Sequence, residues 1–190
     1  MNRKLIIVCA PSGAGKTTIV RHLLENISGL EFSISATNRP KREYETDGYD
    51  YYFIDTESFR KKISDDAFLE WEEVYPGRFY GTLRTEVDRI WNRGNHVIFD
   101  VDVEGGMKIK KQFGERALLV FIRPPSLEHL RNRLHGRGTE SAESLETRIR
   151  KAEKELGYAV HADKILVNDT LENSLPAATK IITQFLENQT

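Results

Sequence analysis

Residues 10–17, Ala-Pro-Ser-Gly-Ala-Gly-Lys-Thr, constrain the fold more than any other stretch of this chain. An apolar run from Leu5 to Cys9 precedes them, and an amphipathic segment that begins at Ile19 follows them. The order is buried strand, glycine-bearing turn and helix start, which is the context that a phosphate-binding loop requires. Glycine lets the backbone turn several N–H groups toward an anion, and the helix places the positive end of its dipole at the same point.

The last two residues of this stretch suit a nucleoside triphosphate bound with Mg²⁺. Lys16 supplies a point charge for the β- and γ-phosphates, and the Thr17 hydroxyl is a metal ligand. The full pattern G-x-x-x-x-G-K-[ST] has glycine where this chain has Ala10, so the first turn must form with a Cβ present. The alternative is an ordinary strand-to-helix turn with incidental glycine, lysine and threonine.

Length and charge limit the classes of protein that fit. The chain has 190 residues, of which 39% are apolar, and this suits one α/β domain with small insertions. A formal net charge of −1 argues against an extended nucleic-acid-binding surface, which needs a basic excess. No apolar run reaches the roughly 20 residues that cross a bilayer, so we expect a cytoplasmic protein with no membrane partner.

Cysteine and histidine offer little chemistry here. The single cysteine, Cys9, cannot form an internal disulfide, and its place in an apolar strand predicts a buried thiol. The five histidines are scattered without metal-ligand spacing. We therefore predict no structural metal.

Four apolar segments predict the strands of a central sheet, at residues 4–9, 96–102, 117–122 and 164–168. Helical patterns separate them, so we expect a mostly parallel sheet with right-handed crossovers. The second segment ends in Asp100 and Asp102, and ligands of open parallel sheets gather at the carboxyl ends of the strands. Asp100 can then hold the hydration shell of Mg²⁺, whereas a cap for the next helix is the alternative for Asp102.

Residues 34–84 predict a small antiparallel sheet with one helix, inserted after the first strand and helix as one wall of a cleft. Near its start, Arg39 and Arg42 flank Pro40 and Lys41. Two arginines three positions apart can clamp a phosphate with their planar guanidinium groups. A solvated basic turn is the alternative.

A helix that begins at Leu127 leads to a glycine-bearing tip at residues 136–138. Arginines at 133, 137, 148 and 150 project positive charge from the resulting helical hairpin. A flap of this kind suits phosphoryl transfer, because its closure brings cations to the transferred group and excludes water. The alternative is a surface hairpin with Arg/Glu pairs.

Over nearly its whole length the chain resembles the guanylate kinase family, a P-loop family of nucleoside monophosphate kinases. The shared motifs stand in family order: APSGAGKTT, FSISATNRPKR, DGYDYYFID, FLEWEEV, FYGT, VIFDVDVEGG, PPSLEHLRNRLHGRGTE and ILVND. The loop alone indicates only a nucleotide triphosphatase or kinase, whereas the Ser/Thr/Arg pattern of residues 33–42, FLEW and the GRG lid distinguish this family. Asn38 and Pro40-Lys41 depart from the family's usual turn without removing an arginine.

The resemblance implies an α/β P-loop three-layer fold with a mostly parallel central sheet, an inserted small GMP-binding subdomain and a helical lid. A single domain then spans residues 1–190, with its core at about 1–33, 85–130 and 158–190, the GMP-binding subdomain at about 34–84 and the lid at about 131–157. The implied reaction transfers the γ-phosphoryl group of ATP to GMP, and also to dGMP, with Mg²⁺, in purine nucleotide metabolism. The oligomeric state stays open.

Two alternatives remain beside this activity. One is a non-catalytic guanylate-kinase-like module that binds a phosphorylated peptide; such modules tend to lose the loop and lid charges, which this chain keeps. The other is a kinase for a different phosphorylated small molecule, which needs the loop but not Glu70.

The resemblance also implies roles for individual residues. The GMP phosphate is bound by Arg39, Arg42, Tyr51 and Tyr80. The guanine is bound by Ser35, Glu70, Thr82 and Asp102. ATP is bound by Ser12, Gly13, Ala14, Gly15, Lys16, Thr17, Thr18 and Asn168. The metal ligands are Thr17 and Asp100, and the catalytic cations are Lys16, Arg39, Arg133, Arg137 and Arg148.

The chemistry of guanine agrees with these roles. Guanine presents N1–H and the exocyclic N2–H₂ side by side, so the Glu70 carboxylate can accept from both, whereas adenine offers no such pair of donors. The GMP phosphate is already an anionic nucleophile and needs no general base. The cations therefore only neutralise charge and align the phosphates for in-line attack.

Overall fold

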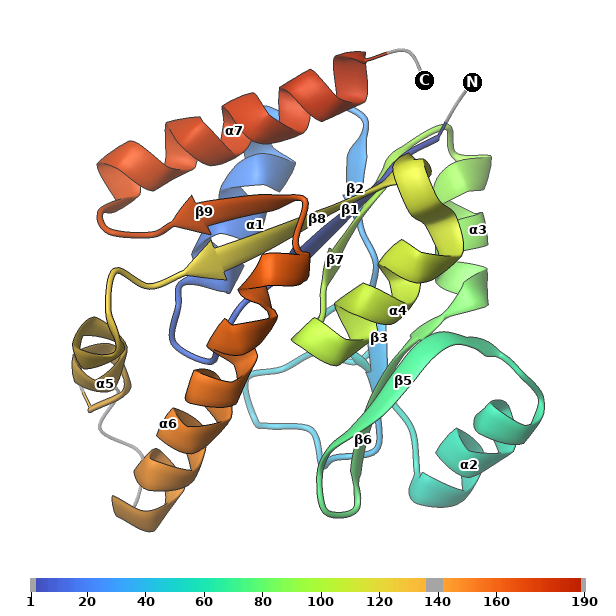
Figure 1. Ribbon diagram of the computed structural model, residues 1–190. Coiled ribbons are helices and arrows are strands. Elements are labelled where there is room, and N and C mark those ends of the chain that lie inside the picture. The colour runs from blue at the N-terminus through green and yellow to red at the C-terminus, as the bar shows by residue number, and fades with distance from the viewer. Residues whose placement is uncertain (1–2, 136–141, 189–190) are drawn as a thin grey trace.

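The computed structural model describes residues 3–135 and 142–188 (Figure 1). In these residues the central sheet has the strand order β2-β7-β1-β8-β9, and every pair of neighbours is parallel. The strands are β1 (Leu5–Cys9), β2 (Leu30–Phe32), β7 (His96–Asp100), β8 (Ala117–Arg123) and β9 (Lys164–Val167). The expectation of a mostly parallel sheet in an α/β fold is therefore confirmed.

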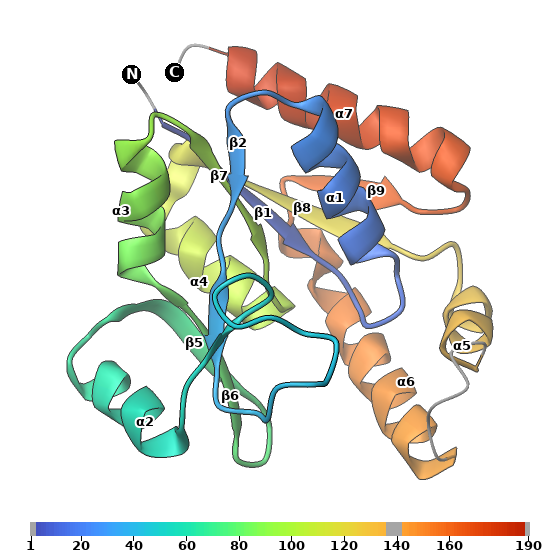
Figure 2. The same ribbon diagram turned by 180° about the vertical axis from the view of Figure 1, so that it is seen from behind.

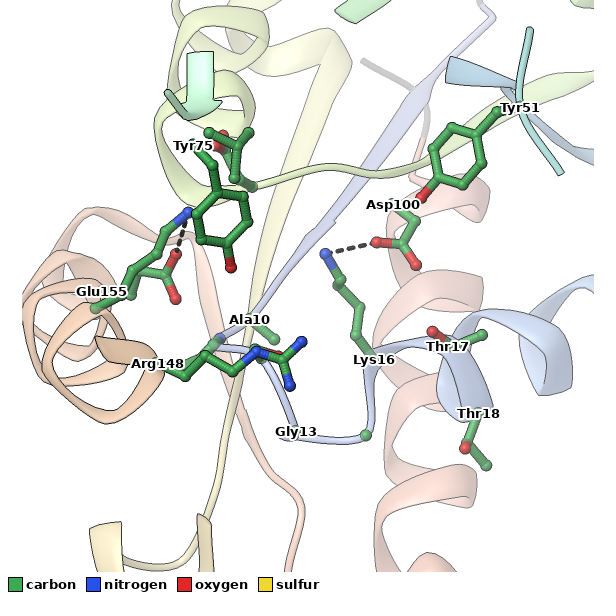
Figure 3. Close-up of a pocket in the computed structure, with 16 residues that line it drawn as sticks. Ala10, Gly13, Lys16, Thr17, Thr18, Tyr51, Tyr75, Asp100, Arg148 and Glu155 are labelled. Carbon is green, nitrogen blue, oxygen red and sulfur yellow. Dashed lines mark ion pairs between the residues drawn. The ribbon is translucent and has the colours of Figure 1, made fainter. Parts of the chain in front are cut away.

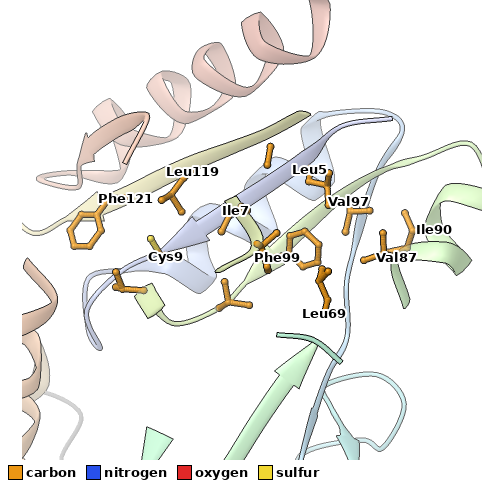
Figure 4. Close-up of a cluster of buried hydrophobic side chains, with 14 of the residues drawn as sticks. Leu5, Ile7, Cys9, Leu69, Val87, Ile90, Val97, Phe99, Leu119 and Phe121 are labelled. Atoms are coloured by element: carbon orange, nitrogen blue, oxygen red, sulfur yellow. The ribbon is translucent and has the colours of Figure 1, made fainter. Parts of the chain in front are cut away.

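Helices cover both faces of this sheet, because successive strand residues point to opposite sides. Leu5 and Ile7 of β1 face a core that includes α3 (Arg84–Asn92) and α4 (Val103–Phe113), part of which is drawn in Figure 4. Ile6 and Val8 face the other core, formed with α1 (Lys16–Asn26) and α7 (Leu171–Glu187). The result is a three-layer arrangement, with the buried sheet in the middle (Figures 1 and 2).

The core of the fold differs from the sequence-based expectation in three elements, β2, β7 and α3. Residues 30–32 form a further core strand, β2, before the chain enters the insertion. Strand β7 ends at Asp100 rather than at residue 102, because Asp102 has already taken the extended backbone of a helix N-cap. Helix α3, which the sequence patterns did not indicate, follows the insertion and packs against β7.

The insertion forms a second sheet with strand order β4-β3-β6-β5, below the central sheet in Figure 2. Its elements are β3 (Ser35–Thr37), β4 (Tyr52–Phe53), α2 (Thr56–Ser64), β5 (Phe68–Tyr75) and β6 (Arg78–Leu83). The expected antiparallel sheet is corrected here, since β3 and β4 are parallel whereas β3–β6 and β5–β6 are antiparallel. The connection through residues 38–51 is long enough to return the chain for a parallel pair. The insertion has a small hydrophobic core of its own, filled by stacked phenylalanine rings. The ring centroids of Phe59 and Phe68 lie 4.5 Å apart.

Helices α5 (Leu127–His135) and α6 (Ala142–Gly157) pack on each other through Leu130, Leu134, Ile149 and Ala152. They lie beyond the carboxyl end of the central sheet (Figure 1). Short 3₁₀ turns, η1 (Gly114–Arg116) and η2 (Tyr158–His161), precede β8 and β9. The predicted site residue Arg137 lies outside the described residues. Within residues 3–135 and 142–188, every helix is too short or too polar to span a bilayer.

Candidate functional site

The predicted phosphate loop connects β1 to α1 and has the backbone that its glycines allow. Gly13 and Gly15 adopt φ of 88° and 92°, a left-handed conformation that side chains rarely tolerate. A Cβ at Gly15 would also collide with the amide nitrogen of Asn168. The loop therefore needs glycine at residue 15 on both conformational and steric grounds.

Asn168 secures this loop from the end of β9. Its Nδ2 donates to the carbonyl of Ala14 at 2.7 Å, and its Oδ1 accepts from the Ser174 hydroxyl at 2.7 Å. The residue is 3% exposed. The structure thus gives Asn168 a bond to the predicted phosphate loop, and the expected contact with ATP stays a prediction.

Lys16 points from the first turn of α1 toward the carboxyl end of β7, as Figure 3 shows. Its Nζ lies 2.5 Å from Asp100 Oδ1 and donates to the Val101 carbonyl at 3.0 Å. Burial acts to lower the pKa of Lys16, but the charge and hydrogen bond of Asp100 outweigh it, so the pKa lies above its ordinary value. Lys16 is therefore a cation held at the mouth of the loop.

A cavity of about 350 Å³ opens in front of the loop. Figure 3 shows Thr17 and Asp100 close to Lys16, with Arg148 of α6 entering from the opposite side. The predicted site residues that line it are Ser12, Gly13, Gly15, Lys16, Thr17, Tyr51, Thr18, Asp100, Asp102 and Arg148. Arg133 has a different position, because its Nη2 donates to the backbone carbonyls of Asn168 and Asp169 at 3.0 and 3.2 Å.

A second cavity, of about 160 Å³, lies between the insertion and the central sheet. The insertion contributes Ser35, Glu70 and Tyr80 to its lining. Five residues line both cavities: Lys16, Tyr51, Val74, Asp100 and Asp102. The two cavities therefore meet, and two bound molecules could face each other across Lys16.

Glu70 is the buried acid of the second cavity. It projects from β5, is 6% exposed, and its Oε1 accepts from the Thr82 hydroxyl of β6 at 2.7 Å. Burial raises the pKa of Glu70 to about 7; the Thr82 bond opposes this shift, and the charges of Asp102 and Glu72 add to it. The carboxyl is thus poised to gain or lose a proton near neutral pH.

Gly105, a functional position that sequence reasoning missed, makes room for that carboxyl. A Cβ at residue 105 would lie 2.5 Å from Glu70 Oε2. Asp102 accepts from the Gly105 N–H at 2.8 Å, so it caps α4 as the alternative interpretation expects, and it lines both cavities as well. The double glycine just after a strand-end acid was the signal available in the sequence.

Arg39 is held by Glu45, another residue that sequence reasoning missed. Arg39 donates from Nη1 to Glu45 Oε2 at 2.7 Å and from Nη2 to Oε1, and the Arg42 N–H donates to the same carboxylate at 2.8 Å. The hydrogen bond from Arg39 lowers the pKa of Glu45 to about 2, against the effect of burial. The guanidinium of Arg39 also lies 5.0 Å from the ring centroid of Tyr51. The signal available in the sequence was the pair of acids, Glu43 and Glu45, that directly follows the basic residues of this turn.

The remaining predicted residues lie around these cavities. The Arg42 side chain is 60% exposed, as the solvated-turn alternative expects, and its Nη1 donates to Tyr44 at 3.1 Å. In the described part of the chain, the linings of the two cavities leave out six predicted site residues: Ala14, Arg39, Arg42, Thr82, Arg133 and Asn168. Thr82 reaches the second cavity through Glu70, and Arg39 reaches it through Tyr51, which lies edge-on to Tyr80 at 6.0 Å.

Known proteins match this chain over nearly its whole length. The guanylate kinase family model matches residues 2–185. A guanylate kinase of Bacteroides fragilis is 51% identical over 183 residues, which cover 96% of this chain and 90% of that protein. One from Porphyromonas gingivalis is 50% identical over 184 residues, covering 96% and 98%. The crystal structure of guanylate kinase from Anaplasma phagocytophilum aligns with a TM-score of 0.80 at 27% identity, covering 98% and 88%. This chain therefore belongs to the guanylate kinase family.

Proposed function

We propose that this protein transfers the γ-phosphoryl group of ATP to GMP, giving ADP and GDP, and that dGMP is a second acceptor. The observation that carries the proposal is the meeting of two cavities at Lys16, one in front of a phosphate loop and the other beside a buried carboxyl. Family membership supports the same activity. Such a reaction belongs to purine nucleotide metabolism, and we propose the cytoplasm as its location because ATP and GMP occur there.

The ATP phosphates occupy the loop cavity in this proposal. The backbone N–H groups of residues 16–18, in the first turn of α1, would bind the anion, and Lys16 adds its charge. The Thr17 hydroxyl and the Asp100 carboxylate line the same cavity and are hard oxygen donors of the kind that Mg²⁺ prefers. Magnesium bound there neutralises charge on the phosphates. The ion pair with Asp100 already holds the Lys16 ammonium group where the two cavities meet.

GMP occupies the second cavity, with its base against Glu70. Ionised Glu70 accepts from guanine N1–H and N2–H₂, while Ser35 and Asp102 line the cavity beside the base and Thr82 contributes by holding the Glu70 carboxylate. The phosphate lies toward Tyr51 and Tyr80, with Arg39 and Arg42 as its cations. Adenine would leave the buried carboxylate without a pair of donors from the base, at a cost of about 1–3 kcal/mol or more.

Transfer then needs alignment and charge neutralisation rather than a base. The attacking oxygen belongs to the GMP phosphate, which is already an anion, and Lys16 lies where the two cavities meet. Arg148 enters the loop cavity from α6 and can reach the transferred group, and we assign Arg133 and Arg137 to the same lid set. The phosphopeptide-binding alternative is not favoured, since this chain keeps both its loop lysine and its lid arginines.

An ADP-release assay with ATP, Mg²⁺ and a series of acceptors tests this function. GMP should be the best acceptor and dGMP a good one, whereas AMP and UMP should give little ADP above the rate without acceptor. Equal rates with GMP and AMP would contradict the role of Glu70. A complete lack of acceptor-dependent ADP release from folded protein would favour the non-catalytic alternative.

A further inference from the structure

Glu86 is a buried acid outside both cavities, in the first turn of α3, where the chain returns from the insertion to the core. It is 3% exposed. Its Oε2 accepts from the backbone N–H of Ile34 at 3.0 Å, and its Oε1 accepts from the Tyr52 hydroxyl at 2.8 Å. Arg89 donates to the same two oxygens at 3.0 and 2.9 Å. One carboxylate therefore joins donors from three separate segments.

These donors belong to different parts of the molecule. Ile34 lies in the crossing from β2 to β3, and Tyr52 lies in β4 of the insertion. Arg89 lies on α3 and forms a second ion pair with Glu31 of β2, which also accepts from Asn95 at 2.9 Å. Figure 2 shows α3 against the central sheet, just above the insertion. Glu86 is thus joined to the core on one side and to the insertion on the other.

Both contacts on the insertion side are next to predicted GMP-binding residues. Ile34 immediately precedes Ser35, which lines the second cavity. Tyr52 immediately follows Tyr51, which lines both cavities. Neighbouring residues of an extended chain point to opposite sides, so a bond that holds one of them also fixes where the next one points. The Glu86 carboxylate therefore binds the chain immediately beside two residues that line the cavities.

An ordinary helical ion pair between Glu86 and Arg89 does not account for this arrangement. Such i,i+3 pairs on exposed surfaces are worth a few tenths of a kcal/mol and need no partners from elsewhere in the chain. Here burial alone would raise the pKa of Glu86, but the bonds from Arg89, Ile34 and Tyr52 outweigh it and lower the pKa. Glu86 is an anion whose bonds extend into the insertion.

We propose that Glu86 is a positioning residue for GMP: by binding the Ile34 N–H and the Tyr52 hydroxyl it fixes the hinge of the insertion, and with it Ser35 and Tyr51. The inference rests on the proposed placement of GMP between the insertion and the core. Glu86 lines neither cavity and its bonds reach the insertion, so its effect should fall on GMP binding. The ATP loop lies on the core and is not attached to this hinge.

Three substitutions test this role, measured by steady-state kinetics with each substrate varied in turn. Tyr52→Phe removes one hydroxyl without changing shape, and Glu86→Gln removes the charge. Glu31→Gln is the matched control, because it removes the other acid bound to Arg89 but breaks no bond to the insertion. We expect the KM for GMP to rise about ten-fold in E86Q and about three-fold in Y52F, from the loss of hydrogen bonds to a charged group. The KM for ATP should stay at its wild-type value in both variants, and E31Q should keep the wild-type KM for GMP.

The double variant Y52F/E86Q should bind GMP no more weakly than E86Q, because the hydroxyl has then lost its charged acceptor. A wild-type KM for GMP in both single variants would overturn the inference, as would an equal rise in E31Q. A lower kcat with unchanged KM values would mean a loss of folded enzyme, and would also overturn it. If E86Q does not fold, Y52F alone decides the matter.

Glu70→Gln, assayed in parallel, separates this inference from the proposed function. If E70Q keeps the wild-type preference for GMP, the placement of GMP is wrong and the role of Glu86 fails with it. If E70Q loses that preference while E86Q and Y52F keep the wild-type KM, only the role of Glu86 fails.

Discussion

Glu70→Gln combined with a change of pH tests guanine recognition in depth. Burial raises the pKa of Glu70 to about 7, while guanine's two donors require the ionised carboxylate. GMP binding below that pH must therefore expel a proton. The ionised fraction of Glu70 falls from about nine-tenths at pH 8 to about one-tenth at pH 6, so the affinity for GMP should fall about ten-fold over this range.

The glutamine side chain of E70Q cannot ionise, and this makes the variant a matched reference. It can keep the bond from Thr82, but its NH₂ group would face the donors of guanine. Losing a charged hydrogen bond and gaining an unpaired donor should cost about 3 kcal/mol, or about 100-fold in kcat/KM for GMP at pH 8. The GMP phosphate titrates near pH 6 in both proteins, so its effect cancels when their pH profiles are divided.

The same shift predicts the stability of the protein without nucleotide. The folded-state pKa of Glu70 lies above its ordinary value of 4.5, so the folded protein binds more protons than the unfolded chain between pH 4.5 and 7. Stability must then fall as pH rises through that window, by roughly 3 kcal/mol in total, and the loss is complete above pH 7. E70Q should therefore unfold at a higher temperature than wild type at pH 8, and at a similar temperature at pH 4.

Calorimetric titration of GMP at pH 6, in two buffers of different ionisation enthalpy, counts the proton directly. Wild type should release close to one more proton per GMP than E70Q. The reasoning would be refuted by wild type and E70Q showing the same proton count and the same dependence of GMP affinity on pH.

Three further substitutions probe the neighbouring residues. Gly105→Ala places a Cβ 2.5 Å from Glu70 Oε2, so the KM for GMP should rise about ten-fold while the KM for ATP stays unchanged. Gly157→Ala is the control, because a Cβ at residue 157 meets no atom within 4 Å. A wild-type KM for GMP in G105A would contradict the steric argument. Glu45→Gln should raise the KM for GMP by about ten-fold because Arg39 loses its charged partner, whereas a lower KM would mean that Glu45 competes with the phosphate. Lys16→Ala should lower kcat about 1,000-fold, while the affinity for GMP, measured by titration, stays near that of wild type. Wild-type turnover in K16A would contradict the proposal that this loop binds the ATP phosphates.

Short-range signals in the sequence were enough to predict four strands of the central sheet (β1, β7, β8 and β9) and the loop after β1, whereas the three-residue strand β2 was missed. Strand β1 is an uninterrupted apolar run. Glycines and a lysine between a buried strand and a helix start are typical of a phosphate-binding loop. Helix α3 was missed although Val87 and Ile90 have helical spacing, because the segment lies between a strand and a turn and is only nine residues long. The parallel pairing of β4 depends on the path of residues 38–51, which no local pattern encodes.

The parts of the site that escaped prediction depend on long-range contacts. Glu45 gains its role only when the turn brings it against Arg39, and Gly105, in α4, gains its role from the Glu70 carboxyl on β5. Glu86 joins residues that are 52 and 34 positions away in the chain. Sequence spacing identifies groups with suitable chemistry, whereas the partners that orient them follow from the tertiary fold.

A bisubstrate inhibitor, in which a polyphosphate chain links adenosine to guanosine, tests the central claim that one continuous site holds both nucleotides face to face across Lys16. The account predicts inhibition that is competitive with ATP and also competitive with GMP, and binding far tighter than that of either nucleotide alone. Competition with only one of the two substrates, at an affinity no better than that of a single nucleotide, would contradict it.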